Sequence, residues 1–172
     1  MDMTRSSAKK AAFGGMLAAA SLIFSYAETL IPLHLIIPIP GFKLGLANIC
    51  VMLAAFYLGI GSAFWLTLVK CALTALLFGT PVSFLFSLGG GLLSFFFLFF
   101  VKDLKGKYIG YLGIAVACAA LHNVGQVCVS ALFFKDAAVF WYLEWLLPVS
   151  VITGIITGCG ALAFERIVKT EK

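Results

Sequence analysis

The chain has 172 residues, of which 63% are hydrophobic and only 11% are charged, and its net charge is +5. Its mean hydropathy is +1.12, whereas soluble domains are only about half apolar, so the composition excludes a soluble globular protein. Apolar stretches occupy nearly all of residues 11–164. We therefore expect a single integral membrane domain over residues 1–172.

The first apolar stretch, residues 11–31, follows the basic sequence MDMTRSSAKK, as in a secretory signal peptide. It is too long for a signal peptide and no clear small-x-small cleavage site ends it, so we interpret it as a retained helix. Small residues recur every four positions at Ala11, Gly15 and Ala19, and again at Gly154 and Gly158. Such ridges favour close helix packing, either inside the bundle or against a second membrane subunit.

Six segments are apolar and close to the length of about 20 residues that a membrane-crossing helix needs. They are residues 11–31, 44–60, 62–79, 82–101, 109–134 and 139–164. Turn-forming residues separate them, most visibly Pro38, Pro40 and Gly41 in HLIIPIPGFKLGLANI. The sequence thus predicts an all-α bundle of six transmembrane helices, in which the short second and third helices form an adjacent antiparallel pair.

The basic residues predict the orientation of the bundle, because cytoplasmic loops are enriched in lysine and arginine. With six spans, one side collects both termini and the 102–107 loop, which together carry nine of the twelve basic residues. The other side has only Lys43 and Lys135. We therefore expect both termini in the cytoplasm, and we interpret the basic residues as topology signals rather than as a nucleic-acid site.

Lys70 is the basic residue that remains, near the middle of the third predicted span. A lysine at that depth costs about 2.5–3.5 kcal/mol on insertion scales. Thr67 and Thr74 share its helix face at about 100° per residue. Two interpretations stay open, namely that Lys70 pairs with Glu28 or Glu144, or that it meets an anionic group of a ligand.

The fifth predicted span carries the polar sequence LHNVGQVCVS. His122, Asn123, Gln126 and Ser130 occupy one sector of this helix, so we expect an inward-facing polar patch. Such a patch is either an interhelical hydrogen-bond network or part of a ligand site.

Aromatic and acidic residues gather toward the outer ends of the first and sixth predicted spans. Glu28 lies near the end of the first span, and Trp141, Glu144 and Trp145 lie near the start of the sixth. An aromatic, partly polar vestibule would suit a planar ligand, and interfacial anchoring explains the tryptophans equally well.

The motifs that the sequence lacks argue against an enzyme. There is no GxxxxGK[ST] phosphate loop, and the aspartates Asp2, Asp103 and Asp136 are isolated, so no paired carboxylates are present to hold Mg²⁺ over a diphosphate. The five cysteines lie singly, with no metal-ligand spacing, and there are only two histidines. We therefore expect no catalytic site, no metal and no cofactor.

The stretch IPGFKLGLANICVMLAAFYLG, together with LHNVGQ, resembles a bacterial membrane family called the Gx transporter family. Members of that family often carry the name heptaprenyl diphosphate synthase component I. The resemblance covers nearly the whole chain, and PGFKLGLANI is its most specific part. The family is in turn similar to the substrate-binding S components of energy-coupling factor transporters, which have six helices and cytoplasmic termini.

This resemblance implies roles for individual residues. Residues 32–47 would form a lid over an outward cavity, with Lys43 and Asn48 reaching into it. The S-component motif that docks the coupling subunit would map to Ala11, Gly15 and Ala19, with glycine in place of alanine at the middle position.

Taken together, these observations predict a substrate-binding membrane subunit that captures a small anionic or amphipathic aromatic molecule, such as a vitamin or a quinone or prenyl precursor. Lys43 and Lys70 would balance negative charge, Asn48, His122, Asn123, Gln126 and Glu144 would supply polar contacts, and Trp141 and Trp145 would stack. Energy would come from a membrane coupling subunit with cytoplasmic ATPases. The alternative is a non-catalytic accessory component of heptaprenyl diphosphate or quinone synthesis, or of quinone- or flavin-linked electron transfer.

Overall fold

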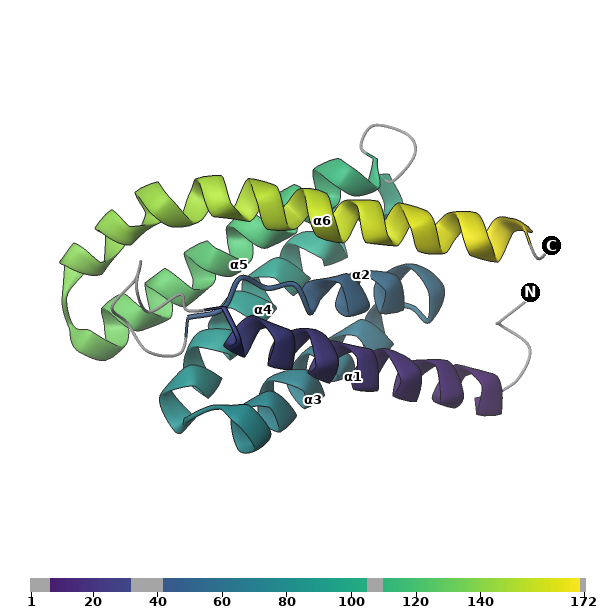
Figure 1. Cartoon of the computed structure of the whole chain (residues 1–172), viewed down its shortest axis with the longest axis horizontal. Coiled ribbons are helices and arrows are strands. Elements are labelled where there is room, and N and C mark those ends of the chain that lie inside the picture. Colours follow the sequence, from purple (N-terminus) through teal and green to yellow (C-terminus); the bar gives the residue numbers. More distant parts are fainter. Residues whose placement is uncertain (1–6, 32–41, 105–109, 171–172) are drawn as a thin grey trace.

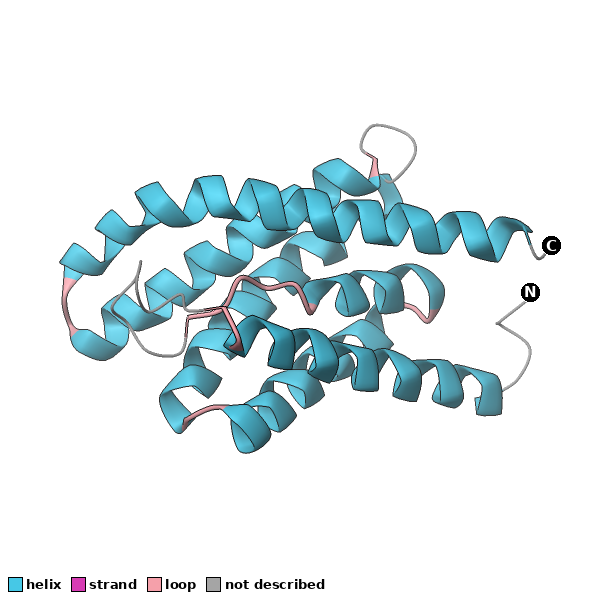
Figure 2. Cartoon of the chain, in the orientation of Figure 1, coloured by secondary structure: helices cyan, strands magenta, loops and turns pink. Residues whose placement is uncertain are grey.

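The structure, a computed structural model, describes residues 7–31, 42–104 and 110–170 and consists there of helices and their connections, without strands (Figures 1 and 2). The long helices are α1 (Ser7–Thr29), α3 (Ile60–Phe78), α4 (Pro81–Val101), α5 (Tyr111–Phe134) and α6 (Leu143–Thr170). The shorter elements are α2 (Asn48–Tyr57) and the 3₁₀ turns η2 (Lys102–Leu104) and η3 (Ala137–Tyr142). The predicted all-α class is confirmed.

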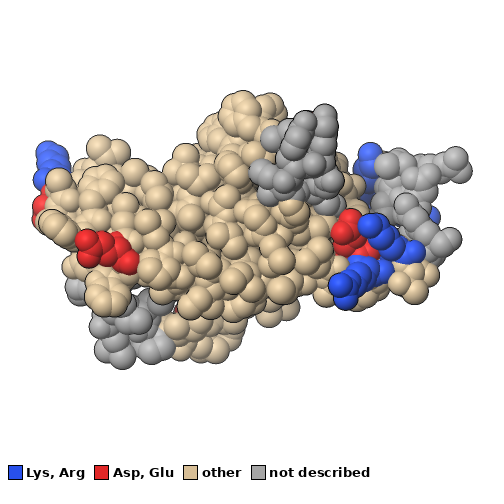
Figure 3. All heavy atoms as spheres, turned by 90° about the horizontal axis from the view of Figure 1, so that it is seen from above, with Lys and Arg blue, Asp and Glu red and all other residues tan. Residues whose placement is uncertain are grey.

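Five of these helices are long and apolar enough to cross a membrane, so the protein is a multi-pass membrane protein. The start of α1 and the end of α6 lie at the same end of the bundle (Figure 1). On the face that Figure 3 shows, charged side chains gather at the two ends and an uncharged surface lies between them. This distribution suits a bundle whose middle contacts lipid.

The second helix differs from its prediction. We expected a span over residues 44–60, but α2 has ten residues and is therefore about 15 Å long, about half of the roughly 30 Å hydrocarbon core. Residues 42–47 precede it as non-helical backbone, and Gly45 has a φ of 85°. The predicted pairing with the third helix is confirmed, because α2 packs against α3 across a turn at Leu58 and Gly59.

The last helix also differs at both ends. Residues 139–142, predicted as its first turn, belong to the 3₁₀ turn η3, and α6 continues beyond residue 164 to Thr170. In the turn between α5 and η3, the Asp136 side chain accepts a hydrogen bond from the Ala138 amide at 2.8 Å. This local bond favours a tight turn over continued α-helix.

Glycines set the closest helix contacts. A Cβ added at Gly125 on α5 would lie 2.6 Å from the Gly89 carbonyl oxygen on α4, and one added at Gly154 on α6 would lie 2.4 Å from the Val116 Cα on α5. A Cβ at Gly158 would similarly lie 3.0 Å from the Leu112 Cα. The small-residue ridge on α6 therefore serves packing within the bundle.

Two apolar clusters occupy the two ends of the bundle. The larger one surrounds α2, with Leu53, Leu98 and Ile114 among its members, and the smaller one surrounds Phe86 and Leu146. Between them lie buried polar residues, contributed by all six helices. Since lipid offers no hydrogen bonds, these polar groups must find partners inside the protein or in a ligand.

Candidate functional site

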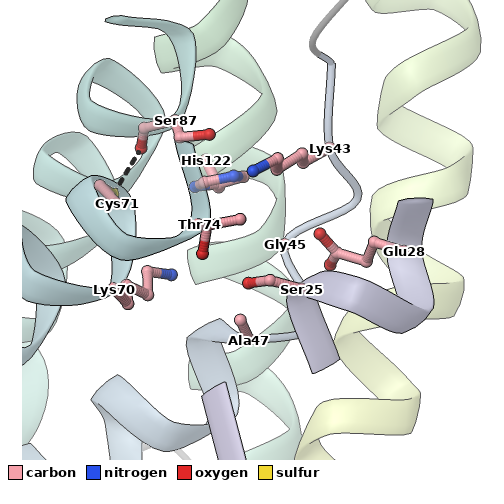
Figure 4. Close-up of a pocket in the computed structure, with 10 residues that line it drawn as sticks. All are labelled: Ser25, Glu28, Lys43, Gly45, Ala47, Lys70, Cys71, Thr74, Ser87 and His122. Carbon is pink, nitrogen blue, oxygen red and sulfur yellow. Dashed lines mark hydrogen bonds between the residues drawn. The ribbon is translucent and has the colours of Figure 1, made fainter. Parts of the chain in front are cut away.

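The site is built around the non-helical segment 42–47, which lies beside α1, α3 and α5 (Figure 4). Its backbone is held by buried side chains of other elements. The Lys43 amide donates to Gln126 Oε1 at 2.9 Å, and Gln126 Nε2 donates to the Lys43 carbonyl at 2.7 Å. The Leu46 amide donates to the Glu28 carboxylate. Backbone without helical hydrogen bonds is stable inside a membrane protein when the protein itself supplies its partners.

Gly45 lets the segment pass close to α5. Its φ of 85° lies in the left-handed region that favours glycine. A Cβ at this position would lie 2.9 Å from both His122 Cδ2 and Asn48 Nδ2. The glycine therefore permits both the backbone turn and the contact with His122.

Beneath this segment lies a polar cavity of about 20 Å³, enough for one or two water-sized groups. It is lined by Ser25 and Glu28 of α1, Lys43, Gly45 and Ala47 of the segment and its end, Lys70, Cys71 and Thr74 of α3, Ser87 of α4 and His122 of α5. Figure 4 shows the Lys70 and Glu28 side chains extending toward the cavity from opposite sides. Residues distant in sequence thus converge on one small polar space.

Two lysines share this cavity with one carboxylate. Lys70 is 5% exposed and Glu28 is 3% exposed, while Lys43 is half-buried. The Lys70 ammonium donates to the neutral Asn48 Oδ1 at 2.5 Å. The ion pairs found within 4.0 Å across the described residues join Lys102 to Asp103 and Lys169 to Glu165, so neither cavity lysine has a carboxylate in direct contact there.

Several buried polar groups at the cavity also lack a partner within residues 7–31, 42–104 and 110–170. Thr74 Oγ1 and Ser87 Oγ make no hydrogen bond, although both residues are at least 96% buried. His122 Nδ1 lies beside the Gly90 backbone without reaching hydrogen-bond geometry. Buried polar groups without partners are uncommon in native proteins, so these groups are available to a ligand.

The electrostatics of the segment depend on Lys43, which lies in the connection between α1 and α2. Burial lowers the pKa of the Lys43 ammonium below its ordinary value, and the neighbouring Glu28 carboxylate opposes that shift. A second negative charge beside Lys43 would therefore act in the same direction as Glu28 and favour the protonated lysine.

The structure brings together some of the residues predicted from sequence. Lys43, Lys70 and His122 line one cavity, and Asn48 adjoins it through its hydrogen bond to Lys70. Direct pairing with a glutamate was one of the two interpretations of Lys70. Among the described residues, Lys70 instead donates to the Asn48 amide and forms no ion pair within 4.0 Å.

Other predicted residues are committed elsewhere. Gln126 holds the Lys43 backbone and also donates to Asn123 Oδ1 at 3.3 Å, while Asn123 Nδ2 donates to the Leu146 carbonyl at 3.3 Å. Ser130 is fully buried and has no hydrogen-bond partner in the part of the chain that the structure describes. The polar patch of α5 is thus partly the interhelical network and partly the cavity wall.

The predicted aromatic vestibule is not assembled around this cavity. Trp141 is 72% exposed and Trp145 is 66% exposed, Glu144 is also exposed, and none of the three lines the cavity. Their positions, in η3 for Trp141 and near the start of α6 for the other two, suit interfacial anchors. Pro38, Pro40 and Gly41 of the predicted lid lie outside the described residues.

Sequence reasoning placed Glu28 near an outer vestibule and did not single out Ser25 or Ser87 at all. A usable signal was present on the first helix, where Ser21, Ser25 and Glu28 recur at helical spacing. Ser87 carried no such signal, because serines in membrane helices often bond their own backbone, as Ser150 does to the Leu147 carbonyl at 2.6 Å.

The ridge of Ala11, Gly15 and Ala19 lies on the exposed face of α1. Beside it runs a groove of about 650 Å³ between α1 and α3, lined also by Gly14, Ala18, Gly61 and Trp65. A Cβ at Gly15 would meet no atom within 4 Å. Unlike the ridge on α6, this one is not used for packing inside the described bundle.

The described residues contain no group of three or more histidine, cysteine, aspartate or glutamate side chains that could hold a metal ion. The cysteines among them are free thiols, of which Cys50, Cys71 and Cys118 are buried. The lysines, the carboxylate and the hydroxyls that line the cavity can recognise a ligand by charge and hydrogen bonding.

Comparison with known proteins agrees with this picture at the level of the family. Neither the curated proteins nor the solved structures contain a significant match to the chain. The profile of a family described as "Heptaprenyl diphosphate synthase component I" matches residues 17–164. That description implies a further component, and it names a component of a synthase rather than a catalytic unit. Since the match covers most of the chain, the protein belongs to the heptaprenyl diphosphate synthase component I family.

Proposed function

We propose that this protein is a substrate-binding membrane subunit that captures a small anionic molecule from the outer side of the bacterial cytoplasmic membrane. The observation that carries the proposal is the buried cavity in which Lys43 and Lys70 face a single carboxylate, Glu28. The unpartnered hydroxyls of Thr74 and Ser87 line the same space.

The energetics favour a binding role over a purely structural one. A buried lysine is costly unless it is paired, and the partner of Lys70 at hydrogen-bond distance among the described residues is the neutral Asn48 amide. A scaffold could replace this lysine with an apolar residue and become no less stable. An anionic ligand would supply the missing charge partner and would accept hydrogen bonds from the nearby hydroxyls.

Access to the cavity depends on the segment 42–47. A space of about 20 Å³ holds one or two water-sized groups, so even a small head group needs the segment to move before it can enter fully. The segment is held at one end by Gln126 and at the other by Glu28. A few hydrogen bonds of this kind can be exchanged at modest cost, so an outward movement of the segment would open the cavity, as the resemblance to S components implies for a lid.

The energy for transport would come from other subunits. The sequence contains no phosphate loop for nucleotide hydrolysis. We propose that a membrane coupling subunit, acting with cytoplasmic ATPases, docks on the α1 ridge of Ala11, Gly15 and Ala19. The exposure of this ridge and the adjoining groove support that placement.

The test is gentle detergent purification of the tagged protein from its native host, followed by mass spectrometry of bound small molecules and proteins. We expect a stoichiometric anion with the wild type, and its loss from the Lys70→Met variant. The control is Lys135→Met, which removes an exposed lysine and should retain the anion. A wild-type protein without any bound anion, or a Lys70→Met variant that keeps it, would contradict the proposal.

The family description favours a second candidate, a membrane accessory component of heptaprenyl diphosphate synthesis. In that case the same purification would recover a prenyl-transferring enzyme without a coupling subunit or ATPases. The polar interior supports the first candidate, because an accessory component that only recruits an enzyme has no need of the buried lysines.

A further inference from the structure

Glu28 is the residue of the cavity with the clearest unassigned role. It comes from α1, is 3% exposed, and lies close enough to both Lys43 and Lys70 to interact electrostatically with each. We infer that Glu28 is a built-in counter-charge that restricts the cavity to ligand groups carrying one negative charge, such as a carboxylate or a sulfonate, and disfavours dianions. This inference rests on the anion-binding function proposed above.

The position of Glu28 is fixed by the fold. Its carboxylate accepts a hydrogen bond from the Leu46 amide, so the same side chain that holds the segment 42–47 also faces the cavity. In Figure 4, Ser25 and Glu28 approach from α1, while Lys70 and Thr74 approach from α3 on the other side. A ligand between the two lysines would therefore have Glu28 as a permanent neighbour.

The count of charges gives the selectivity. Among the described residues, the ionisable groups at the cavity are Lys43, Lys70, Glu28, His122 and the Cys71 thiol. With both lysines protonated, Glu28 ionised, and the imidazole and the thiol neutral, the cavity carries one net positive charge. A monoanion brings that charge to zero, whereas a dianion leaves an uncompensated negative charge in a low-dielectric interior, which is strongly unfavourable.

The neutral lining is consistent with a single small head group. Thr74 and Ser87 each offer a hydroxyl without a partner, and Ser25 also lines the cavity. Hydroxyls can donate to anionic oxygens without adding charge. The hydroxyls thus supply further hydrogen-bond donors, while the charges of the two lysines and Glu28 determine how much negative charge the cavity accepts in a ligand.

The experiment compares two probes that share a sulfur–oxygen head group and differ in charge. Methanesulfonate is a monoanion and sulfate is a dianion at neutral pH. Binding of each to the purified protein is measured by calorimetry. For the wild type we expect methanesulfonate to bind at least about tenfold more tightly than sulfate.

The decisive variant is Glu28→Gln, which removes the negative charge but keeps an oxygen that can accept the Leu46 hydrogen bond. We expect its affinity for sulfate to rise at least about tenfold relative to methanesulfonate. The control is Asp103→Asn, which makes the same change in net charge at an exposed position far from the cavity. Asp103 follows the end of α4 and lies about 24 Å along the chain axis from Ser87, the α4 residue that lines the cavity. This variant should leave the selectivity unchanged. Glu28→Asp, which keeps the charge, should retain a preference for methanesulfonate even if the segment is loosened.

The outcomes separate this inference from the proposed function. Equal binding of the two probes by the wild type, or an unchanged ratio in a folded Glu28→Gln variant, would overturn the role of Glu28 while leaving anion binding intact. If neither probe bound and the native purification also yielded no anion, both the inference and the proposed function would fail.

Discussion

The two hydrogen bonds between the Gln126 side chain and the backbone of the segment 42–47 offer the most direct test of the fold around the site. The Gln126 amide accepts from the Lys43 N–H and donates to the Lys43 carbonyl, at 2.9 and 2.7 Å. In Gln126→Met, a side chain of similar length would leave both backbone groups without these partners. The variant therefore removes the hydrogen bonds with little change in volume.

The magnitude follows mainly from the two orphaned Lys43 groups, and the longer 3.3 Å bond to Asn123 Oδ1 is lost as well. A buried donor or acceptor left without a partner costs about 1–3 kcal/mol. Because both bonds are only partly buried and water can reach part of the segment, we expect a total loss of about 2–4 kcal/mol. For a chain of this size that corresponds to a fall in Tm of about 4–16 °C.

The assay is thermal unfolding in detergent, combined with hydrogen exchange at the backbone amides of Lys43 and Leu46. Ser130→Ala is the matched control on the same helix, because the Ser130 hydroxyl is buried without a partner and its removal should be neutral or stabilising. If Gln126→Met were as stable as Ser130→Ala and exchange at Lys43 were not faster, the view that Gln126 holds the segment would be refuted.

Two further predictions concern the same segment. Gly45→Ala should destabilise the protein by about 1–3 kcal/mol, because φ is 85° and the new Cβ would lie 2.9 Å from His122 Cδ2. Thermal unfolding would measure this against Gly15→Ala, where the Cβ meets open space, and equal stability of the two variants would contradict it. The affinity for methanesulfonate should fall as the pH rises, and the fall should begin below the ordinary lysine pKa of 10.5. Burial lowers the pKa of Lys43, so its ammonium loses the proton at a lower pH than an exposed lysine does. Lys43→Arg, which stays charged, should flatten that decline, and an identical pH profile would argue against a role for Lys43.

The parts of the fold that depend on hydropathy were predictable from the sequence. Five apolar helices form where the apolar segments lie, because a membrane offers the backbone no other partners than its own helix. Lys70 and His122 were predicted to face inward because a polar side chain is costly in lipid, and both line the cavity. In each case a single local property, apolar length or polarity in an apolar setting, decided the structure.

The start of α2 could not be predicted in this way. Residues 44–47 are as apolar as the helix that follows, yet they are not helical. Their conformation depends on Gly45 and on two side chains, Gln126 and Glu28, that come from helices distant in sequence. Tertiary hydrogen bonds therefore override the local preference for helix.

The tryptophans show a second limit of local pattern. Trp141 and Trp145 were placed beside the ligand because aromatic and acidic residues gather near the start of the sixth predicted span. Trp141 belongs to the 3₁₀ turn η3, which has about 3.0 residues per turn rather than 3.6, whereas Trp145 lies near the start of α6. Both rings lie exposed at the end of the bundle.

The cavity separates the groups that hold the chain from the groups that hold charge. Gln126, a neutral amide, fixes the Lys43 backbone and leaves the Lys43 ammonium free to meet a ligand. Asn48, also neutral, positions Lys70 without cancelling its charge. Substitutions of the amides Gln126 and Asn48 should therefore affect stability more than charge selectivity. Substitutions of the two lysines should affect charge selectivity more than stability. Glu28 alone belongs to both groups, because it accepts from Leu46 and faces both lysines. It is consequently the one position in the described cavity where a change of charge should alter both ligand selectivity and the hold on the segment.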